Sequence, residues 1–422
     1  MKRNRWVFAE HRNFIMIDFK FLQKILPRIY SFLPFYLAPG FSLPPVQAFF
    51  EVTYRCNLRC EMCHYLEIIE ETETKQTYKN EMSGEDVKKA ISKLPRFSLI
   101  TFTGGEAFMK NDFMEILEFA TQKHKVHIIT NGTTLSEKVV QDLLRLRLKS
   151  VWGSGLFYMG VSLEGGEALH DSITTVPGSF KKTTQGLERL VARRKELKSR
   201  FPLIHVTCVI NRGNVRELVP LYEYANELGV NVANYVLSSP ATYWHGKDYD
   251  QDEHLQRPTA PVEEIEPKLL RGQLQLLQEK SEVGTTQLRF SPNYITVDEI
   301  VRYYSNQSSY QDYRCYIPWT KVAFSAYGDV FSCPHYRVGN VEDRSMAWQS
   351  ERIRDFRVKL KKEGIFPGCL GCCQSEYIGS LAREVVTEDR VQRVKFSKTQ
   401  ESDCVIPAFR REIPGEHTGY ES

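Results

Sequence analysis

The sequence predicts an α/β fold built on a parallel sheet, followed by a small cysteine-rich domain. Three observations support this prediction. Short apolar runs alternate with helical patterns between residues 47 and 238, glycine or polar turns follow those runs, and five cysteines gather between residues 315 and 373. Such alternation is typical of βαβ units, whose strands end where α/β folds place their ligands.

The predicted elements follow one another with short connections. Strands are expected at 47–54, 99–105, 126–132, 156–165, 204–211 and 231–238, and helices at 83–94, 112–124, 136–148, 180–197 and 215–229. Ser83 is the expected cap of the first of these helices, with Asp86 three residues further on. A polar, proline-bearing segment then leads to a helix expected near 263–282.

Composition places the chain among globular proteins. It has 422 residues, of which 42% are hydrophobic and 26% charged, and a length of this kind suggests two or three domains. The net charge of +4 is too small to favour nucleic acid as a partner. The first residues show no apolar signal-peptide run, so we expect a reducing cytoplasm in which clustered cysteines bind metals.

Residues 14–46 form an apolar and aromatic stretch that contains basic side chains. Pro27, Pro34 and Pro39 interrupt it, so it is not expected to span a bilayer as one helix. Two interpretations remain open. It is either a helix that packs on the main domain, or a surface that makes peripheral contact with a membrane or admits an apolar substrate.

Three thiols are crowded into the stretch TYRCNLRCEMCHY, at Cys56, Cys60 and Cys63. Three thiolates on one short loop can bind three irons of a 4Fe–4S cubane and leave the fourth iron open. A zinc ion would need a fourth ligand from elsewhere, and His64 directly follows Cys63, which makes it a strained choice.

The stretch CNLRCEMC resembles the CxxxCxxC motif of the radical SAM superfamily. The resemblance implies a partial (β/α)6 TIM-like barrel in which S-adenosylmethionine binds the open iron. It also implies that one electron from the cluster cleaves this cofactor, and that the resulting 5′-deoxyadenosyl radical abstracts hydrogen from a substrate. An external electron donor such as flavodoxin or ferredoxin is then required.

Four further stretches resemble the same family: TFTGGEAFM, TNGT, VSLEGGEALHD and CVINRGN. The resemblance implies that Glu106 meets the cofactor's amino group, that Ser162 lies near its carboxylate or ribose, and that Ile210 packs on its adenine. The full set of implied cofactor-binding residues is Gly104, Gly105, Glu106, Asn131, Ser162 and Ile210. Ser172 follows His-Asp where the family usually has arginine.

The second cysteine set resembles the SPASM/twitch extension of radical SAM enzymes. Its implied ligands are Cys315, Cys333, Cys369 and Cys372. The later C-x5-C-x3-C part of the full SPASM pattern is missing, so we expect the shortened form with one auxiliary 4Fe–4S cluster that transfers electrons. Two alternatives stay open, namely a zinc ion at this site and Cys373 as a ligand in place of Cys372.

The predicted organisation has five parts. They are an N-terminal extension (1–46), a radical SAM barrel core (47–238), a lid or linker with a helix (239–309), a SPASM/twitch-like auxiliary cluster domain (310–379) and a charged tail (380–422). Aromatic and polar residues at 243–249 are expected either to line the open side of the barrel or to form an exposed loop.

The functional prediction is a radical SAM oxidoreductase that abstracts hydrogen from an unidentified small molecule, sugar, lipid or peptide. Two alternatives remain: a SPASM-type peptide maturase, and a non-catalytic iron–sulfur or zinc-binding protein. The sequence does not identify a general base, and no nucleic-acid-binding domain is recognisable.

Overall fold

The computed structural model describes residues 30, 33–240, 255–256, 258–333, 335–342 and 348–379. Residues 1–29 of the N-terminal extension, the aromatic stretch at 243–249 and the tail 380–422 lie outside the described residues. The strands are β1 (Gln47–Glu51), β2 (Leu99–Thr103), β3 (Lys125–Thr130), β4 (Gly155–Ser162), β5 (Leu203–Ile210), β6 (Val232–Leu237), β7 (Gln287–Ser291), β8 (Tyr313–Arg314), β9 (Lys321–Phe324), β10 (Asp329–Cys333), β11 (Tyr336–Asn340) and β12 (Glu376–Tyr377).

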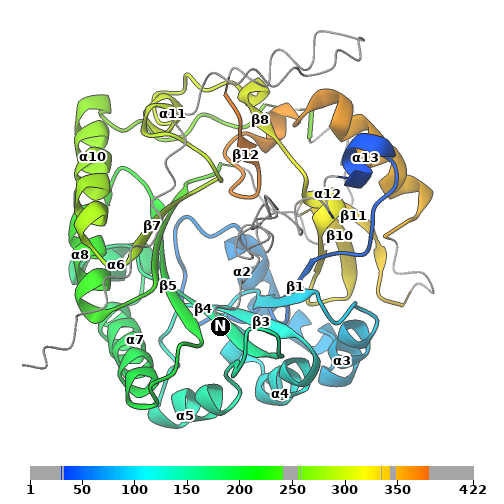
Figure 1. The fold of residues 1–422 in the computed structure, drawn as a ribbon, viewed down its shortest axis with the longest axis horizontal. Coiled ribbons are helices and arrows are strands. Elements are labelled where there is room, and N and C mark those ends of the chain that lie inside the picture. The colour runs from blue at the N-terminus through cyan, green and yellow to red at the C-terminus, as the bar shows by residue number, and fades with distance from the viewer. Residues whose placement is uncertain are drawn as a thin grey trace, which may run out of the picture.

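The chain between the strands forms helices, several of which cover the outside of the sheet. The helices are α2 (Leu66–Thr74), α3 (Gly84–Ser92), α4 (Phe113–Lys123), α5 (Glu137–Arg145), α6 (Glu167–Thr174), α7 (Ser179–Glu196), α8 (Leu218–Leu228), α10 (Pro267–Val283), α11 (Val297–Tyr303), α12 (Ile317–Thr320) and α13 (Glu351–Glu363). Figure 1 shows α3, α4, α5, α7, α8 and α10 in an arc around the curved sheet. Ser83 caps α3 by accepting a hydrogen bond from the Asp86 N–H, as expected.

The predicted parallel sheet is confirmed. Strands β1 to β6 lie side by side in chain order, and every neighbouring pair among them is parallel. This is the core of a partial barrel (Figure 1). Each predicted strand and helix between residues 47 and 238 is present, with boundaries shifted by a few residues.

The sheet continues beyond both edges of the predicted barrel core. At one edge β7 pairs in parallel with β6, within a segment for which only a linker and a helix were expected. At the other edge β9 pairs in parallel with β1 and leads into the antiparallel strands β10 and β11. The cysteine-rich segment therefore extends the barrel wall, and ten strands of the described chain form one sheet.

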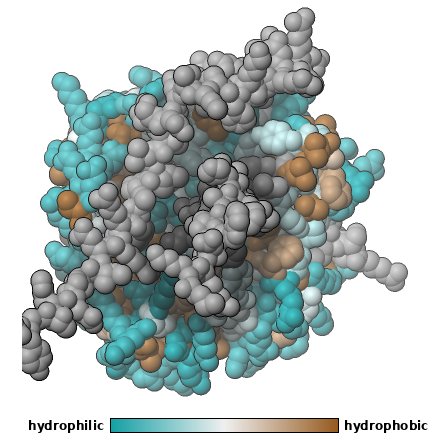
Figure 2. Space-filling model, viewed as in Figure 1, coloured by the Kyte–Doolittle hydropathy of each residue, from teal (hydrophilic) through white to brown (hydrophobic). Residues whose placement is uncertain are grey.

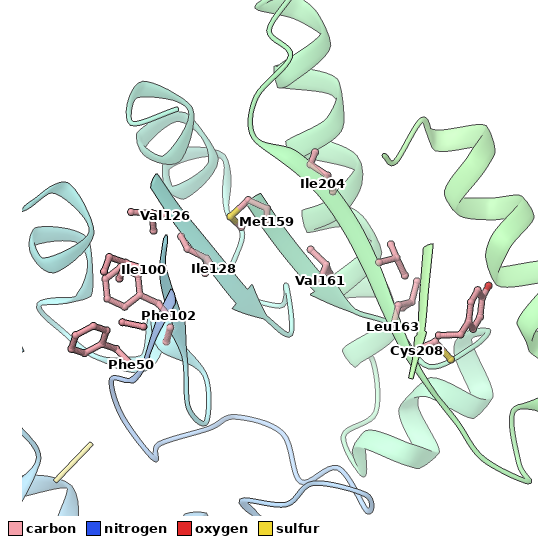
Figure 3. Packing of buried hydrophobic residues seen from close by; sticks show 14 of the residues in the cluster. Phe50, Ile100, Phe102, Val126, Ile128, Met159, Val161, Leu163, Ile204 and Cys208 are labelled. Atoms are coloured by element: carbon pink, nitrogen blue, oxygen red, sulfur yellow. The ribbon is translucent and has the colours of Figure 1, made fainter. Parts of the chain in front are cut away.

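The outer face of the sheet forms the hydrophobic core with the helices. Figure 3 shows apolar side chains from successive strands packed in one row. Phe50, Ile100, Phe102, Val126 and Ile128 are all fully buried. They alternate along their strands with side chains that face the barrel interior, because successive residues of a strand point to opposite faces.

The end of the N-terminal extension packs on the C-terminal segment. Residues 33–37 are helical, and the centroid of the Phe35 ring lies 4.8 Å from those of the Tyr316 and Trp319 rings. Leu33 and Leu37 are 52% and 75% exposed, and Figure 2 shows apolar surface on the side where this helix lies in Figure 1. Among the helices of the described chain, none combines the length and apolar character that a membrane crossing requires.

The inner face of the barrel carries a polar layer. The imidazole rings of His127 and His205 lie 5.1 Å apart, between centroids. Burial lowers the pKa of both, and that of His205 falls to about 4 with a smaller contribution from the charge of Arg289. Gly160 makes room for His205, since a Cβ at Gly160 would lie 2.3 Å from the His205 Nε2 atom.

We therefore expect Gly160→Ala to destabilise the fold by about 1–3 kcal/mol, the usual range for an overpacked interior. Gly272→Ala is the matched control, because Gly272 is exposed in α10 and a Cβ there meets nothing within 4 Å. This control should be neutral or gain about 0.5–1 kcal/mol, since alanine favours helix. Chemical denaturation compares the two variants, and equal effects would contradict the close packing of His205.

Candidate active site

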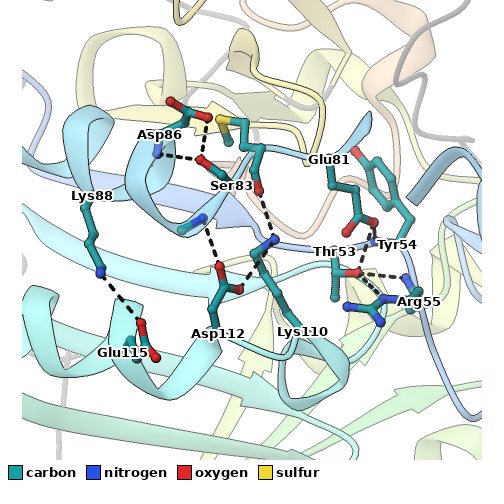
Figure 4. Close-up of polar contacts among 12 residues, drawn as sticks. Thr53, Tyr54, Arg55, Glu81, Ser83, Asp86, Lys88, Lys110, Asp112 and Glu115 are labelled. Atoms are coloured by element: carbon teal, nitrogen blue, oxygen red, sulfur yellow. Dashed lines mark hydrogen bonds and ion pairs between the residues drawn. The ribbon is translucent and has the colours of Figure 1, made fainter. Parts of the chain in front are cut away.

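The loop that carries Cys56, Cys60 and Cys63 connects β1 to α2 at the carboxyl edge of the barrel. Its first residues are held by Glu81, a residue that the sequence did not mark. The Glu81 carboxylate accepts hydrogen bonds from the Thr53 hydroxyl at 2.9 Å and the Tyr54 N–H at 2.7 Å (Figure 4). The chain therefore leaves β1 in a defined direction before it reaches the first thiol.

The glycine pair after β2 packs directly on this loop. The Gly105 N–H donates to the Thr53 carbonyl and the Glu106 N–H donates to the Arg55 carbonyl, both at 2.9 Å. Gly104 has a φ of +126°, and a Cβ there would lie 2.4 Å from the Thr53 oxygen. A Cβ on Gly105 would lie 2.4 Å from the Arg55 oxygen. Only glycines allow so close a backbone contact.

Glu106 is fully buried, and its carboxylate joins two loops. It accepts hydrogen bonds from the Thr130 hydroxyl at 2.9 and 3.0 Å and from the Asn131 N–H at 2.8 Å. Burial raises the pKa of Glu106, although these donors oppose the shift. The resemblance implies that Glu106 contacts the cofactor's amino group. The sequence did not predict that this carboxylate also binds the end of β3.

Asn131 in turn reaches the cysteine loop. Its side-chain amide donates to the Asn57 side-chain oxygen at 2.9 Å, and the Asn57 amide donates to the Thr133 hydroxyl at 2.8 Å. On the other side, the N–H of Arg59 donates to the Thr174 carbonyl of α6 at 3.0 Å. The cysteine loop is thus held by Glu81, by the loops after β2 and β3, and by α6.

The remaining predicted cofactor residues end neighbouring strands. Ser162 is the last residue of β4, and its half-buried hydroxyl makes no hydrogen bond within the described chain. Ile210 is the last residue of β5 and is fully buried, with its carbonyl accepting from the Tyr304 hydroxyl. Both lie at the same edge of the sheet as the cysteine loop, because the strands are parallel.

Glu164 is a further buried carboxyl near the first cysteine set. It accepts a hydrogen bond from the Val209 N–H at 2.8 Å, and burial raises its pKa to about 7. Its charge raises the pKa of Cys60, so the two groups are electrostatic neighbours. The sequence placed Glu164 in a family-like stretch without a role, since nothing local shows that β4 and the cysteine loop meet.

The donor set of the first site fits an iron–sulfur cluster. Burial, with smaller contributions from neighbouring charges, raises the pKa of Cys56 to about 11 and that of Cys60 to about 12, and burial also raises the pKa of Cys63. Three half-buried thiols that repel one another as anions need a bound cation to ionise together. A cubane provides this and takes one thiolate on each of three irons.

The second cysteine set is assembled by short strands. β8 ends immediately before Cys315, β12 begins three residues after Cys373, and the two strands pair antiparallel. Gly328, with φ +87°, forms the turn between β9 and β10 that leads to Cys333. The N–H of Cys372 donates to the Cys369 carbonyl at 3.0 Å.

Charge interactions show that these thiols are neighbours. Burial raises the pKa of Cys333, and the charges of Cys369 and Cys315 raise it further. The pKa of Cys372 is raised by burial and by three other thiols, those of Cys373, Cys369 and Cys315. No three His, Cys, Asp or Glu side chains of the described chain converge tightly enough to bind one metal ion. A cubane does not need such convergence, because each thiolate binds its own iron.

A cavity of about 230 Å³ lies between the two cysteine sets. Its lining includes His64 and Tyr65, which directly follow Cys63, and also Cys333 itself and Gln374. Apolar walls come from strands of the barrel, among them Phe49 and Ile129. The sequence did not predict this cavity, because its residues come from both ends of the described chain.

Comparisons with known proteins agree with this geometry. Residues 50–225 match the family model of the radical SAM superfamily, and residues 315–373 match that of the SPASM iron–sulfur cluster-binding domain. The chain is 27% identical to a tungsten-containing aldehyde ferredoxin oxidoreductase cofactor-modifying protein of Pyrococcus furiosus, over 77% of this chain and 86% of that protein.

Other similar proteins differ in name and in the length matched. The antilisterial bacteriocin subtilosin biosynthesis protein AlbA of Bacillus subtilis is 23% identical over 80% of this chain and 68% of its own. The Fe-coproporphyrin III synthase of Methanosarcina barkeri is 31% identical, but the match spans only 42% of this chain and 40% of that protein. Streptococcus suis SuiB, solved with its precursor peptide SuiA, shares the fold with a TM-score of 0.53, at 13% identity over 84% of this chain and 74% of its own.

The contact between Gly105 and the Arg55 carbonyl gives a direct test of how the first site is built. We expect Gly105→Ala to displace the cysteine loop and to lower iron and sulfide content after anaerobic reconstitution by about half, because one of two cubanes is lost. Gly166→Ala is the control, since the nearest atom to its Cβ lies 3.4 Å away. Full iron loading of Gly105→Ala would contradict the proposed dependence of the loop on this glycine.

Proposed function

We propose that this chain, a radical SAM protein with a C-terminal SPASM domain, modifies a substrate held in the cavity between its two cysteine sets. The observation that supports this most strongly is the position of that cavity, with Tyr65 beside the first set and Cys333 of the second set in its lining. A substrate in this position would be close to both sites. The apolar walls would exclude water from a reactive radical.

Cys56, Cys60 and Cys63 would hold the first cluster. When bound, this cluster with S-adenosylmethionine supplies the electron transfer that generates a 5′-deoxyadenosyl radical. The Gly104–Gly105 turn, Glu106 and Asn131 would keep the cofactor site in shape through their contacts with the cysteine loop. Ser162 offers a hydroxyl with no partner in the described chain, which supports a contact with the cofactor.

Cys315, Cys333, Cys369 and Cys372 would hold one auxiliary 4Fe–4S cluster for electron transfer. The mutual charge effects among these thiols support this set. We prefer Cys372 over Cys373 because the charges of Cys369 and Cys315 raise the pKa of Cys372. An oxidoreductase reaction would follow if this cluster accepts the substrate's electron.

The substrate class that we propose is a peptide or a cofactor precursor. The similar proteins are named for modifying a cofactor, for bacteriocin biosynthesis and for porphyrin synthesis, and one solved structure of the same fold contains a precursor peptide. The electron that starts the reaction would come from an external donor such as a flavodoxin or a ferredoxin.

The test measures 5′-deoxyadenosine formed by anaerobically reconstituted protein with S-adenosylmethionine and a strong reductant. We expect formation by the wild type and none by the Cys56/Cys60/Cys63→Ala triple variant, because the first cluster cannot assemble. A Cys315→Ala/Cys333→Ala variant is the matched control. It should fall from about eight to about four irons per chain and still form 5′-deoxyadenosine.

Two results would contradict the proposal. One is 5′-deoxyadenosine formation that persists in the triple variant. The other is a fully iron-loaded wild type that forms none, which would favour a non-catalytic cluster-binding protein.

A further inference from the structure

The cavity between the cysteine sets contains a lysine whose role the proposed function does not explain. Lys321 begins β9 and is half-buried in the cavity lining. Its neighbour Phe324 stacks on Phe50 in the outer core, with ring centroids 4.5 Å apart. Because side chains alternate along a strand, Lys321 and Ala323 lie on the inner face of the barrel.

The ammonium of Lys321 has capacity to bind a ligand. Its Nζ donates to the Gln374 side-chain oxygen at 2.5 Å and lies 5.6 Å from the Phe49 ring centroid. An ammonium carries three N–H donors, so one hydrogen bond leaves two of them. Within the described residues, Lys321 forms no ion pair with a carboxylate. Burial lowers the pKa of Lys321, and the charges of Cys373, Cys315, Cys372 and Glu376 act against this shift.

The carboxylate in the cavity lining, that of Glu51, is already hydrogen-bonded and lies further along the barrel. Glu51 accepts hydrogen bonds from the hydroxyls of Tyr54 at 2.5 Å and Tyr65 at 2.8 Å. Lys321 pairs in register with Gln47, four residues before Glu51 on β1. Four residues of strand correspond to about 13 Å. The cavity therefore has a positive end at Lys321 and a negative end at Glu51.

A second cation increases the positive potential of the barrel interior. Leu288 and Phe290 of β7 pack towards the core, so Arg289 between them faces inward. Its guanidinium donates to the Asn234 side-chain oxygen at 2.8 Å, and within the described chain it forms no ion pair. His127 and His205 in the same layer are kept neutral by burial. The inner face is thus suited to attract an anion.

The cavity volume limits what can bind. At about 230 Å³ it is smaller than the roughly 300–1,000 Å³ of sites for drug-sized ligands. It can hold one apolar residue or a small molecule of similar size, with a charged group at one end. Phe49, Ile129 and Ala323 line the cavity and supply apolar contacts for such a ligand.

We propose that this cavity binds an apolar group that carries a carboxylate, with the carboxylate on Lys321. The inference rests on the proposed function, because it names the chemistry of the substrate part that enters the site. The carboxylate can belong to a free acid or to the C-terminus of a peptide. Lys321 is a binding residue in this account and takes no part in hydrogen abstraction.

The experiment uses the reconstituted full-length protein with both clusters and S-adenosylmethionine, under anaerobic conditions. The probes are N-acetyl-L-phenylalanine and its primary amide, which share shape and differ in charge. Calorimetric titration should show about tenfold tighter binding of the acid, the typical effect of one charge-assisted hydrogen bond. A second pair is N-acetyl-Ala-Ala-Phe with a free or an amidated C-terminus. It tests whether the bound carboxylate is that of a peptide C-terminus or that of a small free acid.

Three variants test whether the Lys321 side chain causes the preference for the acid. Lys321→Met should bind acid and amide equally, and Lys321→Arg should restore most of the preference. Lys125→Met is the matched control, because Lys125 lies on β3 on the same side of the strand as His127, stacks on the Phe157 ring and does not line the cavity. It should keep the full preference for the acid.

Several results would overturn the inference. Equal binding of acid and amide by the wild type would do so, as would a preference that survives in Lys321→Met. If Lys321→Met keeps the preference for the acid but alters the electron paramagnetic resonance spectrum of the reduced auxiliary cluster, Lys321 would be assigned to the cluster instead. The 5′-deoxyadenosine assay on the same samples tests the proposed function separately, since binding of the probes does not require turnover.

Discussion

The backbone contact between the Gly104–Gly105 turn and the cysteine loop is the constraint on which the first site depends. The N–H groups of Gly105 and Glu106 donate to the carbonyls of Thr53 and Arg55, and neither Gly104 nor Gly105 has room for a Cβ. The turn after β2, together with Glu81, therefore determines the direction in which the loop leaves β1. Because the thiols follow directly on this contact, a change at the turn would alter the position of all three.

The pairing of β1 with β9 has a comparable effect on the second site. Gln47 and Lys321 are far apart in the chain but adjacent in the sheet. The strand that follows Cys315 is consequently part of the barrel wall, and the hairpin of β9 and β10 carries Cys333 towards the interior. The distance between the two cysteine sets is set by this sheet, and the cavity between them is a consequence of it.

The two faces of the sheet have different physical roles. The outer face buries apolar side chains under the helices and supplies the hydrophobic stability. The inner face holds His127, His205 and Lys321, whose pKa values are lowered by burial, together with Arg289, which is exposed. Buried polar groups cost stability unless they are hydrogen-bonded or serve a ligand. The polar interior is thus the part of the barrel that is adapted to binding and not to folding.

The sequence by itself determined the features whose signals are local. The alternation of apolar runs and helical patterns predicted β1 to β6 and the helices between them, and three thiols within eight residues predicted the first cluster site. The glycines of the GGE stretch were also found, although the surface that they contact was not. β7 was missed because two apolar residues, Leu288 and Phe290, are too few to show a strand period.

Tertiary structure decided the rest. Glu81, Glu164 and Lys321 have no local signal, since their partners lie on other strands and loops. The roles of these residues follow from which strands pair and which face each side chain takes. A one-residue change in register would reverse every such face, so only the assembled sheet determines that Lys321 points into the cavity and that Glu106 is buried between two loops.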